Sequence, residues 1–195
     1  MRYYVGGVNG AGKSAFLNKL LTERPDWNIV HSPISLMEYL SISGNYQALR
    51  AMPRTEVNDY FATFISELLQ RSDGATDLVV DAHFLNLVHG KTYETISGDW
   101  ISKFGAMVLI TATADEILRR IDLDSGTRDR SLFNMGLSEQ ERYQVLNQYL
   151  VATRLYCERL ASRYKIPLIV LTNTDGQLDK TVTNFLSADR QLRQV

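Results

Sequence analysis

The sequence predicts a three-layer α/β/α sandwich built around a five-stranded parallel sheet. Short apolar runs alternate along the chain with stretches of helical periodicity, a pattern typical of strands joined by crossover helices. Three runs, DLVVD, GAMVLIT and PLIVLT, are nearly continuous in apolar residues, as expected for central strands covered on both faces. No repeat or linker divides the 195 residues, so we expect a single domain over residues 1–195.

Five segments are predicted to be strands because they are short, apolar and bounded by turn-forming or helical sequence. They are Arg2–Gly6, Trp27–His31, Asp77–Asp81, Gly105–Thr111 and Pro167–Thr172. Ligands of such sheets bind at the carboxyl ends of the strands. We therefore expect functional residues in Gly6–Ser14, directly after Asp81, and in the loop near Asp124–Arg130.

Helices are predicted between these strands. Apolar side chains recur at helical spacing over Lys13–Arg24, which ends at a proline, and over Thr55–Arg71. Two more helices begin with capping boxes at Thr113 and Ser138, each followed by Glu three residues later. The inner stripe of the longer helix is expected to pack into the core, and it consists of Leu146, Tyr149/Leu150, Thr153, Tyr156 and Leu160.

Composition limits the function classes. Hydrophobic residues make up 45% of the chain and charged residues 22%, which is ordinary for a globular protein. The net charge of -1 does not indicate the excess of basic residues that is typical of nucleic-acid binding. No apolar run approaches the length of a membrane span. The single cysteine, Cys157, excludes an internal disulfide and is expected to be a core residue. We expect a cytoplasmic protein without a signal peptide, and a homo-oligomer is left open.

Residues Gly7–Ser14, GVNGAGKS, match the phosphate-binding pattern GxxxxGK[ST] directly between a predicted strand and a predicted helix. The glycines let the backbone wrap phosphates closely, and the amide groups and the helix dipole attract negative charge. Lys13 would reach the β- and γ-phosphates, and the Ser14 hydroxyl would ligate Mg²⁺. The sequence therefore predicts a P-loop NTPase fold that binds ATP or GTP with Mg²⁺. The predicted nucleotide-binding residues are Gly7, Asn9, Gly10, Ala11, Gly12, Lys13, Ser14 and Ala15.

Asp81 ends the predicted third strand, after Val79 and Val80. A carboxylate at this place would hold Mg²⁺ directly or through water, so Asp81 is predicted to be both a catalytic residue and, with Ser14, a metal ligand. His83 follows two residues later and is expected to face the same cleft. A structural role and a substrate-binding role are both open for His83.

Missing motifs exclude several P-loop classes. The segment after the fifth strand, Thr172–Asp175, is too short to be the Asn-Lys-x-Asp guanine reader of a GTPase, and Asp81 is not followed by the Asp-x-x-Gly switch. A transporter-type LSGGQ signature is also absent. What remains is a small kinase, whose chemistry requires cations at both phosphate sites. Arg50, Arg128 and Arg130 lie where an acceptor site and a closing lid are expected.

In these segments the chain resembles the archaeal-type adenylate kinases, which are P-loop nucleoside monophosphate kinases. Besides the P-loop, the similar segments are Leu49–Pro53, Val80–His83, Asp115–Arg120 and Thr127–Arg130. The resemblance implies that ATP·Mg²⁺ is the donor and a nucleoside monophosphate, most simply AMP, the acceptor. It also implies that Arg50 holds the acceptor phosphate and that Arg128 and Arg130 neutralise the transferring phosphoryl group. An acceptor-binding insertion at about residues 32–75 and a short lid at about 122–137 belong to the same interpretation.

Two departures from this family concern the acceptor and the transfer step. The Gly/Pro-rich stretch near the acceptor base is replaced by Tyr93–Trp100, so we expect this segment to determine the acceptor. An Asn-Arg pair in the long helix reads Asn147-Gln148, with Arg142 and Arg154 about a turn or more away. A P-loop kinase for another small metabolite and a nucleotide-binding regulatory ATPase are therefore the alternatives.

Overall fold

Five parallel strands form the central sheet of the computed structural model, which describes residues 1–72, 76–124 and 132–194. The strands are β1 (Arg2–Gly7), β2 (Asn28–His31), β3 (Leu78–Asp81), β6 (Ala106–Thr111) and β7 (Leu168–Thr172). Their order is β2-β3-β1-β6-β7, and every neighbouring pair is parallel. The predicted sheet is confirmed, with each strand boundary correct to within one residue.

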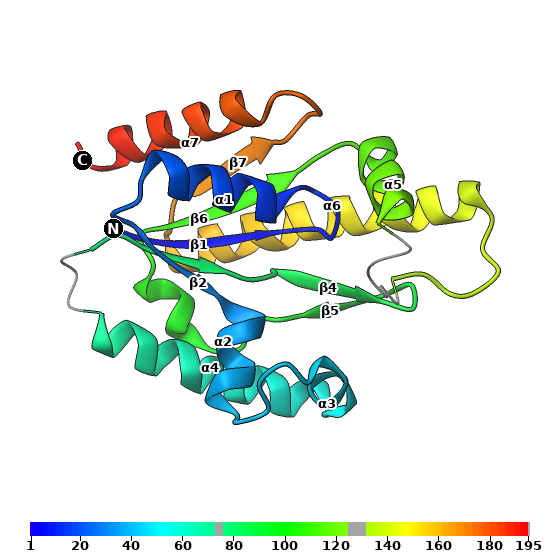
Figure 1. Ribbon diagram of the computed structural model, residues 1–195, viewed down its shortest axis with the longest axis horizontal. Coiled ribbons are helices and arrows are strands. Elements are labelled where there is room, and N and C mark those ends of the chain that lie inside the picture. The colour runs from blue at the N-terminus through cyan, green and yellow to red at the C-terminus, as the bar shows by residue number, and fades with distance from the viewer. Residues whose placement is uncertain (73–75, 125–131, 195) are drawn as a thin grey trace.

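Helices cover both faces of this sheet (Figure 1). On one face α1 (Lys13–Glu23) packs against α7 (Leu178–Leu192). The other face carries α4 (Arg54–Arg71), the short 3-10 helix η1 (Asp99–Lys103) and α6 (Glu139–Tyr164). The three-layer α/β/α sandwich is therefore confirmed.

The alternation of β1 shows how the two layers meet at the sheet. Tyr3 stacks on Trp27, with ring centroids 5.4 Å apart, and packs edge-on against Phe185 of α7. The next residue, Tyr4, points to the opposite face and packs against Phe84 at 5.1 Å. Successive side chains of a strand alternate between faces, so two aromatic clusters hold the strand that leads into the P-loop.

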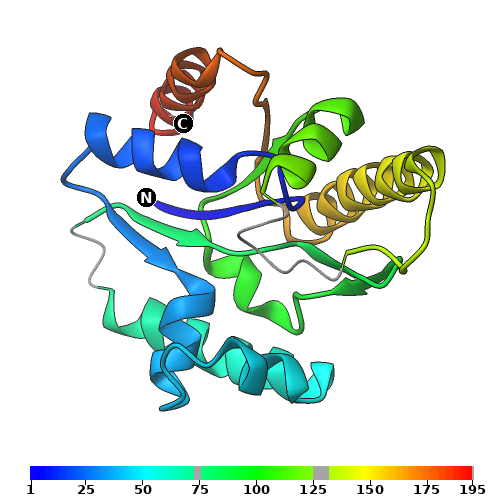
Figure 2. The same ribbon diagram turned by 45° about the vertical axis from the view of Figure 1, so that its right-hand side comes forward.

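Six elements were not predicted from the sequence: η1, α7, α2 (Ser32–Tyr39), α3 (Tyr46–Ala51) and the antiparallel hairpin of β4 (Leu85–Val88) and β5 (Lys91–Glu94). The hairpin turn is His89-Gly90, with φ of 47° and 71°. Positive φ at both central residues is the requirement of a tight type I′ turn. Figure 2 shows α2, α3 and α4 together on the side of the sheet away from α1 and α7.

Both predicted capping boxes are present. Thr113 caps α5 (Ala114–Leu123), and Ser138 caps α6. The predicted inner stripe of α6 is buried at Leu146, Tyr149, Thr153, Tyr156 and Leu160. Cys157 is also fully buried, and burial raises the pKa of its thiol. None of the helices in the described part of the chain is long and apolar enough to cross a membrane.

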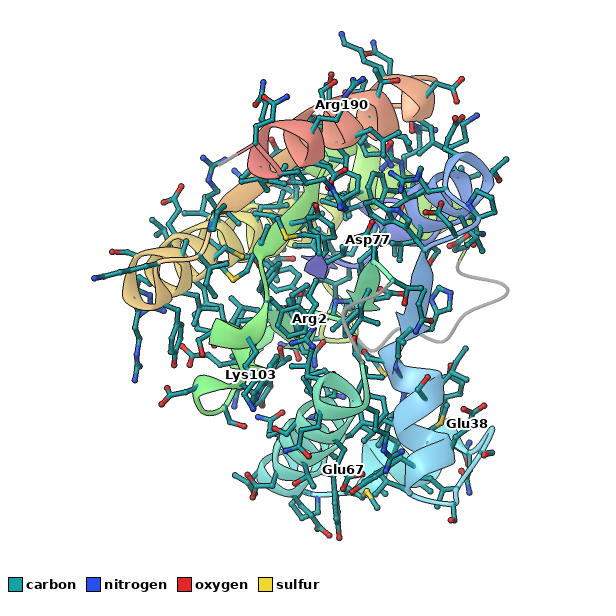
Figure 3. The ribbon with its side chains drawn as sticks, turned by 90° about the vertical axis from the view of Figure 1, so that its left-hand side faces the viewer. Arg2, Glu38, Glu67, Asp77, Lys103 and Arg190 are labelled. Carbon is teal, nitrogen blue, oxygen red and sulfur yellow. The ribbon has the colours of Figure 1, made fainter. Side chains whose placement is uncertain are left out.

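Ionic contacts tie the chain together at the end of the sheet where the strands begin, around Asp77 and Arg2 (Figure 3). The Asp77 carboxylate lies 2.7 Å from Nη2 of Arg193, just after α7, and 3.7 Å from Nη2 of Arg24, just after α1. Nη2 of Arg2 donates to the carbonyl of Leu69 at 3.1 Å in the last turn of α4. This end of the sheet is therefore structural, and the carboxyl ends of the strands are available for a site.

Candidate active site

The predicted phosphate-binding loop lies between β1 and α1 and depends on two glycines in the left-handed region. Gly10 has φ of 86° and Gly12 has φ of 83°, a conformation that side chains disfavour. A Cβ at Gly12 would also lie 2.1 Å from Nδ2 of Asn173. The amide groups of Lys13 and Ser14, in the first turn of α1, have no partner within the helix. The loop thus has the backbone geometry of an anion cradle.

Two side chains from outside the loop fix its carbonyl groups. Nδ2 of Asn173 donates to the carbonyl of Ala11 at 3.0 Å, and Nη1 of Arg120 donates to the carbonyl of Gly10 at 3.2 Å. In a trans peptide the C=O and the following N–H point in opposite directions. The N–H of Gly12 therefore points away from Asn173, and its orientation depends on this hydrogen bond.

Asp175 completes this clamp by supplying the opposite charge. The Arg120 Nη2 lies 2.6 Å from Oδ1 of Asp175 and also donates to the carbonyl of Asn173 at 2.8 Å. Arg119 pairs with the second carboxylate oxygen of Asp175. The segment Thr172–Asp175, which does not match the guanine-binding motif of GTPases, therefore supports the P-loop.

Asp81, at the end of β3, is held between two basic side chains. Lys13 Nζ contacts one carboxylate oxygen, and Nδ1 of His31 lies 2.9 Å from the other. Because a carboxylate only accepts, Nδ1 of His31 carries the proton. The register pairs His31 of β2 with Asp81, so the two side chains meet at adjacent strand ends.

The residues present suit a magnesium ion. Ser14 opens α1 beside Lys13, which contacts Asp81. A hydroxyl and a carboxylate are hard oxygen donors, which Mg²⁺ prefers, and nucleotide phosphates and water normally complete its shell. Ser14 and Asp81 could therefore hold the ion together with a bound nucleotide.

His83 connects the P-loop with a neighbouring cavity. Its Nδ1 lies 2.9 Å from the carbonyl of Gly7, and since a carbonyl only accepts, Nδ1 is the donor. Burial, followed by the positive charge of Lys13, lowers the pKa of His83 to about 4. The imidazole is therefore neutral near pH 7, with Nε2 as a hydrogen-bond acceptor.

The cavity adjoins the P-loop and has a volume of about 440 Å³. Its boundary includes Asn9 of the P-loop and Ala82 and His83 after β3. The remaining walls come from α2, α3, α4 and β4, with apolar side chains that include Leu36, Leu49, Val57, Phe61 and Leu87. A cavity of this size, lined by both apolar and polar side chains, is consistent with a small-molecule site.

The polar groups of this cavity are cationic or neutral. Arg50, in the last turn of α3, and Arg54, in the first turn of α4, both line it. No Asp or Glu is among its lining residues in the described part of the chain. Arg54 is partly buried and has no hydrogen bond or ion pair with any described residue. Such a cavity favours an anionic ligand, because a partly desolvated guanidinium is stabilised by a negative partner.

The other predicted residues differ in how the structure places them. Arg128 and Arg130 lie outside the described residues, as does the central part, residues 125–131, of the expected lid at 122–137. Arg142 pairs with Asp122 at 2.7 Å, so it anchors α6 to α5. Arg154 pairs with Glu158 at 2.5 Å on the exposed side of α6. These two pairs are structural contacts and give no support for a replacement of the missing family arginine.

The expectation for Tyr93–Trp100 needs correction. Of this segment only Thr95 lines the cavity, while Trp100 packs edge-on against Phe61 in the core. Tyr93 belongs to β5, whose four residues are exposed. The wall next to β3 is formed instead by β4, because the chain turns back in the unpredicted hairpin before it reaches this segment.

Comparison with known proteins supports the fold and not one family. No protein-family model and no curated protein matches the sequence. The chain is similar to the shikimate kinase of Bacteroides thetaiotaomicron, with a TM-score of 0.63 at 13% identity over 97% of this chain and 98% of that one. It is also similar to shikimate kinase from Acinetobacter baumannii in complex with shikimate, with a TM-score of 0.64 at 13% identity over 97% of this chain and 93% of that one. A third similar structure is deoxyadenosine kinase from M. mycoides with dCMP and dCDP bound, with a TM-score of 0.54 at 14% identity over 98% of this chain and 100% of that one.

These likenesses show that the chain has the fold of P-loop kinases. The structures named above are shikimate kinases and a deoxyadenosine kinase, so they support the resemblance to the archaeal-type enzymes only at the level of the fold.

Proposed function

We propose that this protein is a P-loop kinase that transfers the γ-phosphoryl group of ATP to an anionic small molecule, with AMP as the first candidate acceptor. The observation that carries the proposal is the cavity beside the P-loop, which is lined by Arg50 and Arg54 and by no described carboxylate. A donor-phosphate cradle that opens into a cationic cavity is the arrangement needed to bring two anions together.

The donor site would use the residues at the carboxyl ends of β1 and β3. The P-loop amide groups and Lys13 would bind the β- and γ-phosphates, and Ser14 and Asp81 would hold Mg²⁺. Bound Mg²⁺ supplies neutralisation of the phosphate charge. Lys13 contacts Asp81, so in this proposal the phosphates of a bound nucleotide would share its ammonium group with the carboxylate.

The acceptor site would use the cavity. Arg50 and Arg54 would bind the anionic group of the acceptor, and the neutral His83 would accept a hydrogen bond through Nε2. Transfer would then proceed in line, without a covalent enzyme intermediate, because positioning and charge neutralisation are the main requirements of this chemistry. In this proposal Arg128 and Arg130, from the lid, would neutralise the transferring group.

Two alternatives make different predictions for the same site. A kinase for another anionic metabolite would use the same two arginines and a different part of the cavity walls. A regulatory ATPase would need no acceptor site, so the cationic cavity favours a kinase.

The test is turnover of ATP·Mg²⁺ with a panel of nucleoside monophosphates and small phosphorylated or carboxylated metabolites, measured as ADP release. We expect AMP to raise ADP formation well above the rate with ATP alone, and Lys13→Ala to abolish it. A response to a non-nucleotide acceptor would select the first alternative. If no acceptor raised the rate, the kinase proposal would fail and the regulatory ATPase would replace it.

A further inference from the structure

One wall of the cavity is formed by β4, and the carboxamide of Asn86 is the only polar side chain that this strand brings to the cavity. Leu85 and Leu87 of this strand are buried, whereas Asn86 and Val88 are partly exposed. Asn86 and Val88 lie on the same face of the strand, because residues two apart share a face, and both line the cavity together with Leu87. The hairpin therefore presents Asn86 to any ligand that occupies this space.

Hydrogen bonds hold this wall in place at both ends. The Tyr149 hydroxyl of α6 donates to the carbonyl of Leu85 at 2.6 Å. At the hairpin turn the N–H of Gly90 donates to the carbonyl of Leu132 at 2.9 Å. At its base the Thr95 hydroxyl donates to the carbonyl of Phe84 at 3.0 Å. A side chain on a strand anchored in this way is preorganised, which is the requirement for a selective contact.

The carboxamide of Asn86 has no hydrogen-bond partner among the described residues, although the side chain is partly buried. Asn9 of the P-loop is in the same situation, whereas two other asparagines near the site use their amides within the protein. Asn58 donates to the carbonyl of Glu94 at 3.1 Å, and Asn173 donates to the carbonyl of Ala11 at 3.0 Å. A partly buried amide without a protein partner is most favourable where a ligand completes its hydrogen bonds.

We infer that Asn86 is a specificity-determining residue that binds the polar edge of the acceptor's nucleobase. The inference rests on the proposed function and narrows its acceptor to a nucleoside monophosphate. A carboxamide offers a donor and an acceptor side by side. It therefore complements adenine, which presents a ring-nitrogen acceptor next to an amino donor. The side chains of Leu36, Val57 and Phe61 supply apolar contact area for the base in the same cavity.

The test compares kcat/KM for three acceptors that have the same net charge: AMP, its analogue without the 6-amino group, and GMP. For Asn86→Leu we expect the preference for AMP over the amino-free analogue to fall by roughly tenfold or more, the effect of losing one good base contact. For Asn86→Asp the carboxylate offers acceptors only, and guanine presents two adjacent donors. We therefore expect the GMP/AMP ratio to rise by roughly tenfold, since the added charge affects both nucleotides alike.

Controls separate this inference from the proposed function. Asn184→Leu, on the exposed surface of α7, should leave all three values unchanged. The melting temperature of the Asn86 variants should match that of the unmodified protein, which shows that they fold. If AMP is phosphorylated but both ratios stay constant in Asn86→Leu and Asn86→Asp, Asn86 does not select the acceptor. If the unmodified protein phosphorylates no acceptor, the proposed function itself fails.

Discussion

Replacing Gly12 and Asn173 singly and together tests how the P-loop is held. Gly12→Ala places a Cβ at φ of 83° and 2.1 Å from Nδ2 of Asn173. The left-handed backbone costs about 1–2 kcal/mol for a residue with a side chain. The Asn173 amide must also move, which breaks its 3.0 Å hydrogen bond to the carbonyl of Ala11. A buried acceptor left without its partner costs about 1–3 kcal/mol more.

The two substitutions should therefore not be additive. Asn173→Ala alone loses the same hydrogen bond and should reduce the free energy of unfolding by about 1–3 kcal/mol. In the Gly12→Ala background that bond is already broken and the Cβ clash is relieved, so the second substitution should cost nearly nothing. The expected coupling is about 1–3 kcal/mol, well above the roughly 0.5 kcal/mol scatter of independent sites.

Equilibrium urea unfolding of the four proteins measures this cycle. A cost of Asn173→Ala that is equal in both backgrounds would refute the clamp, because it would mean that Asn173 and Gly12 act separately. ADP binding gives a second measurement in the Gly12 wild-type background. Asn173→Ala should weaken it by roughly tenfold, since the Gly12 N–H loses its fixed orientation, while Asn184→Ala should leave it unchanged.

Two other predictions concern the acceptor site and the stability of the fold. Arg54→Gln should raise KM for the anionic acceptor by roughly tenfold and leave KM for ATP unchanged, because it removes one charge-assisted contact. Arg71→Gln, at the exposed end of the same helix, is the matched control. Equal effects of Arg54→Gln on the KM of both substrates would argue against an acceptor role. Asp77→Asn should lower the free energy of unfolding by about 1–3 kcal/mol at pH 7. Burial alone would raise the pKa of Asp77, but the contacts with Arg193 and the terminal amine lower it below 3.8. The stabilisation by the Asp77 charge is therefore present above that pH and lost as the pH falls below it. Chemical unfolding across pH 2–7 should show that the difference in free energy of unfolding between the unmodified protein and Asp77→Asn shrinks below pH 4. A difference that stays constant with pH would mean that the Asp77 charge is not the cause.

The fold was predictable where burial leaves a pattern in the sequence. The central strands are covered on both faces, so runs such as Val79–Asp81 and Ala106–Ile110 are apolar at nearly every position. The hairpin leaves no such pattern. Its second strand, Lys91–Glu94, is exposed at all four positions, and α3 has no buried residue among its six. The hairpin is held by hydrogen bonds with α4, α6 and Leu132, and α3 packs Leu49 against the core; local sequence does not describe such contacts.

The candidate site was predictable where one motif contains the residues. Lys13 and Ser14 belong to a contiguous pattern, and Asp81 follows from the end of an apolar strand. His31 and Asn173 were missed, although each occupies the same kind of position, at or directly after the carboxyl end of a strand. The rule that ligands bind at these ends applies to every strand of the sheet, and applying it to β2 and β7 would have identified both.

The distribution of carboxylates decides which cations of this site can bind phosphate. Asp175 lies outside the phosphate cradle and neutralises Arg119 and Arg120, so these two arginines support the P-loop. Asp81 contacts both Lys13 and His31, so the ammonium group of Lys13 already has a protein partner of opposite charge. No described carboxylate lines the cavity that contains Arg54. In the described part of the site, Arg54 in the acceptor cavity is therefore the cation that lacks a carboxylate partner. An anion that enters the cavity is stabilised without displacing a protein partner of Arg54.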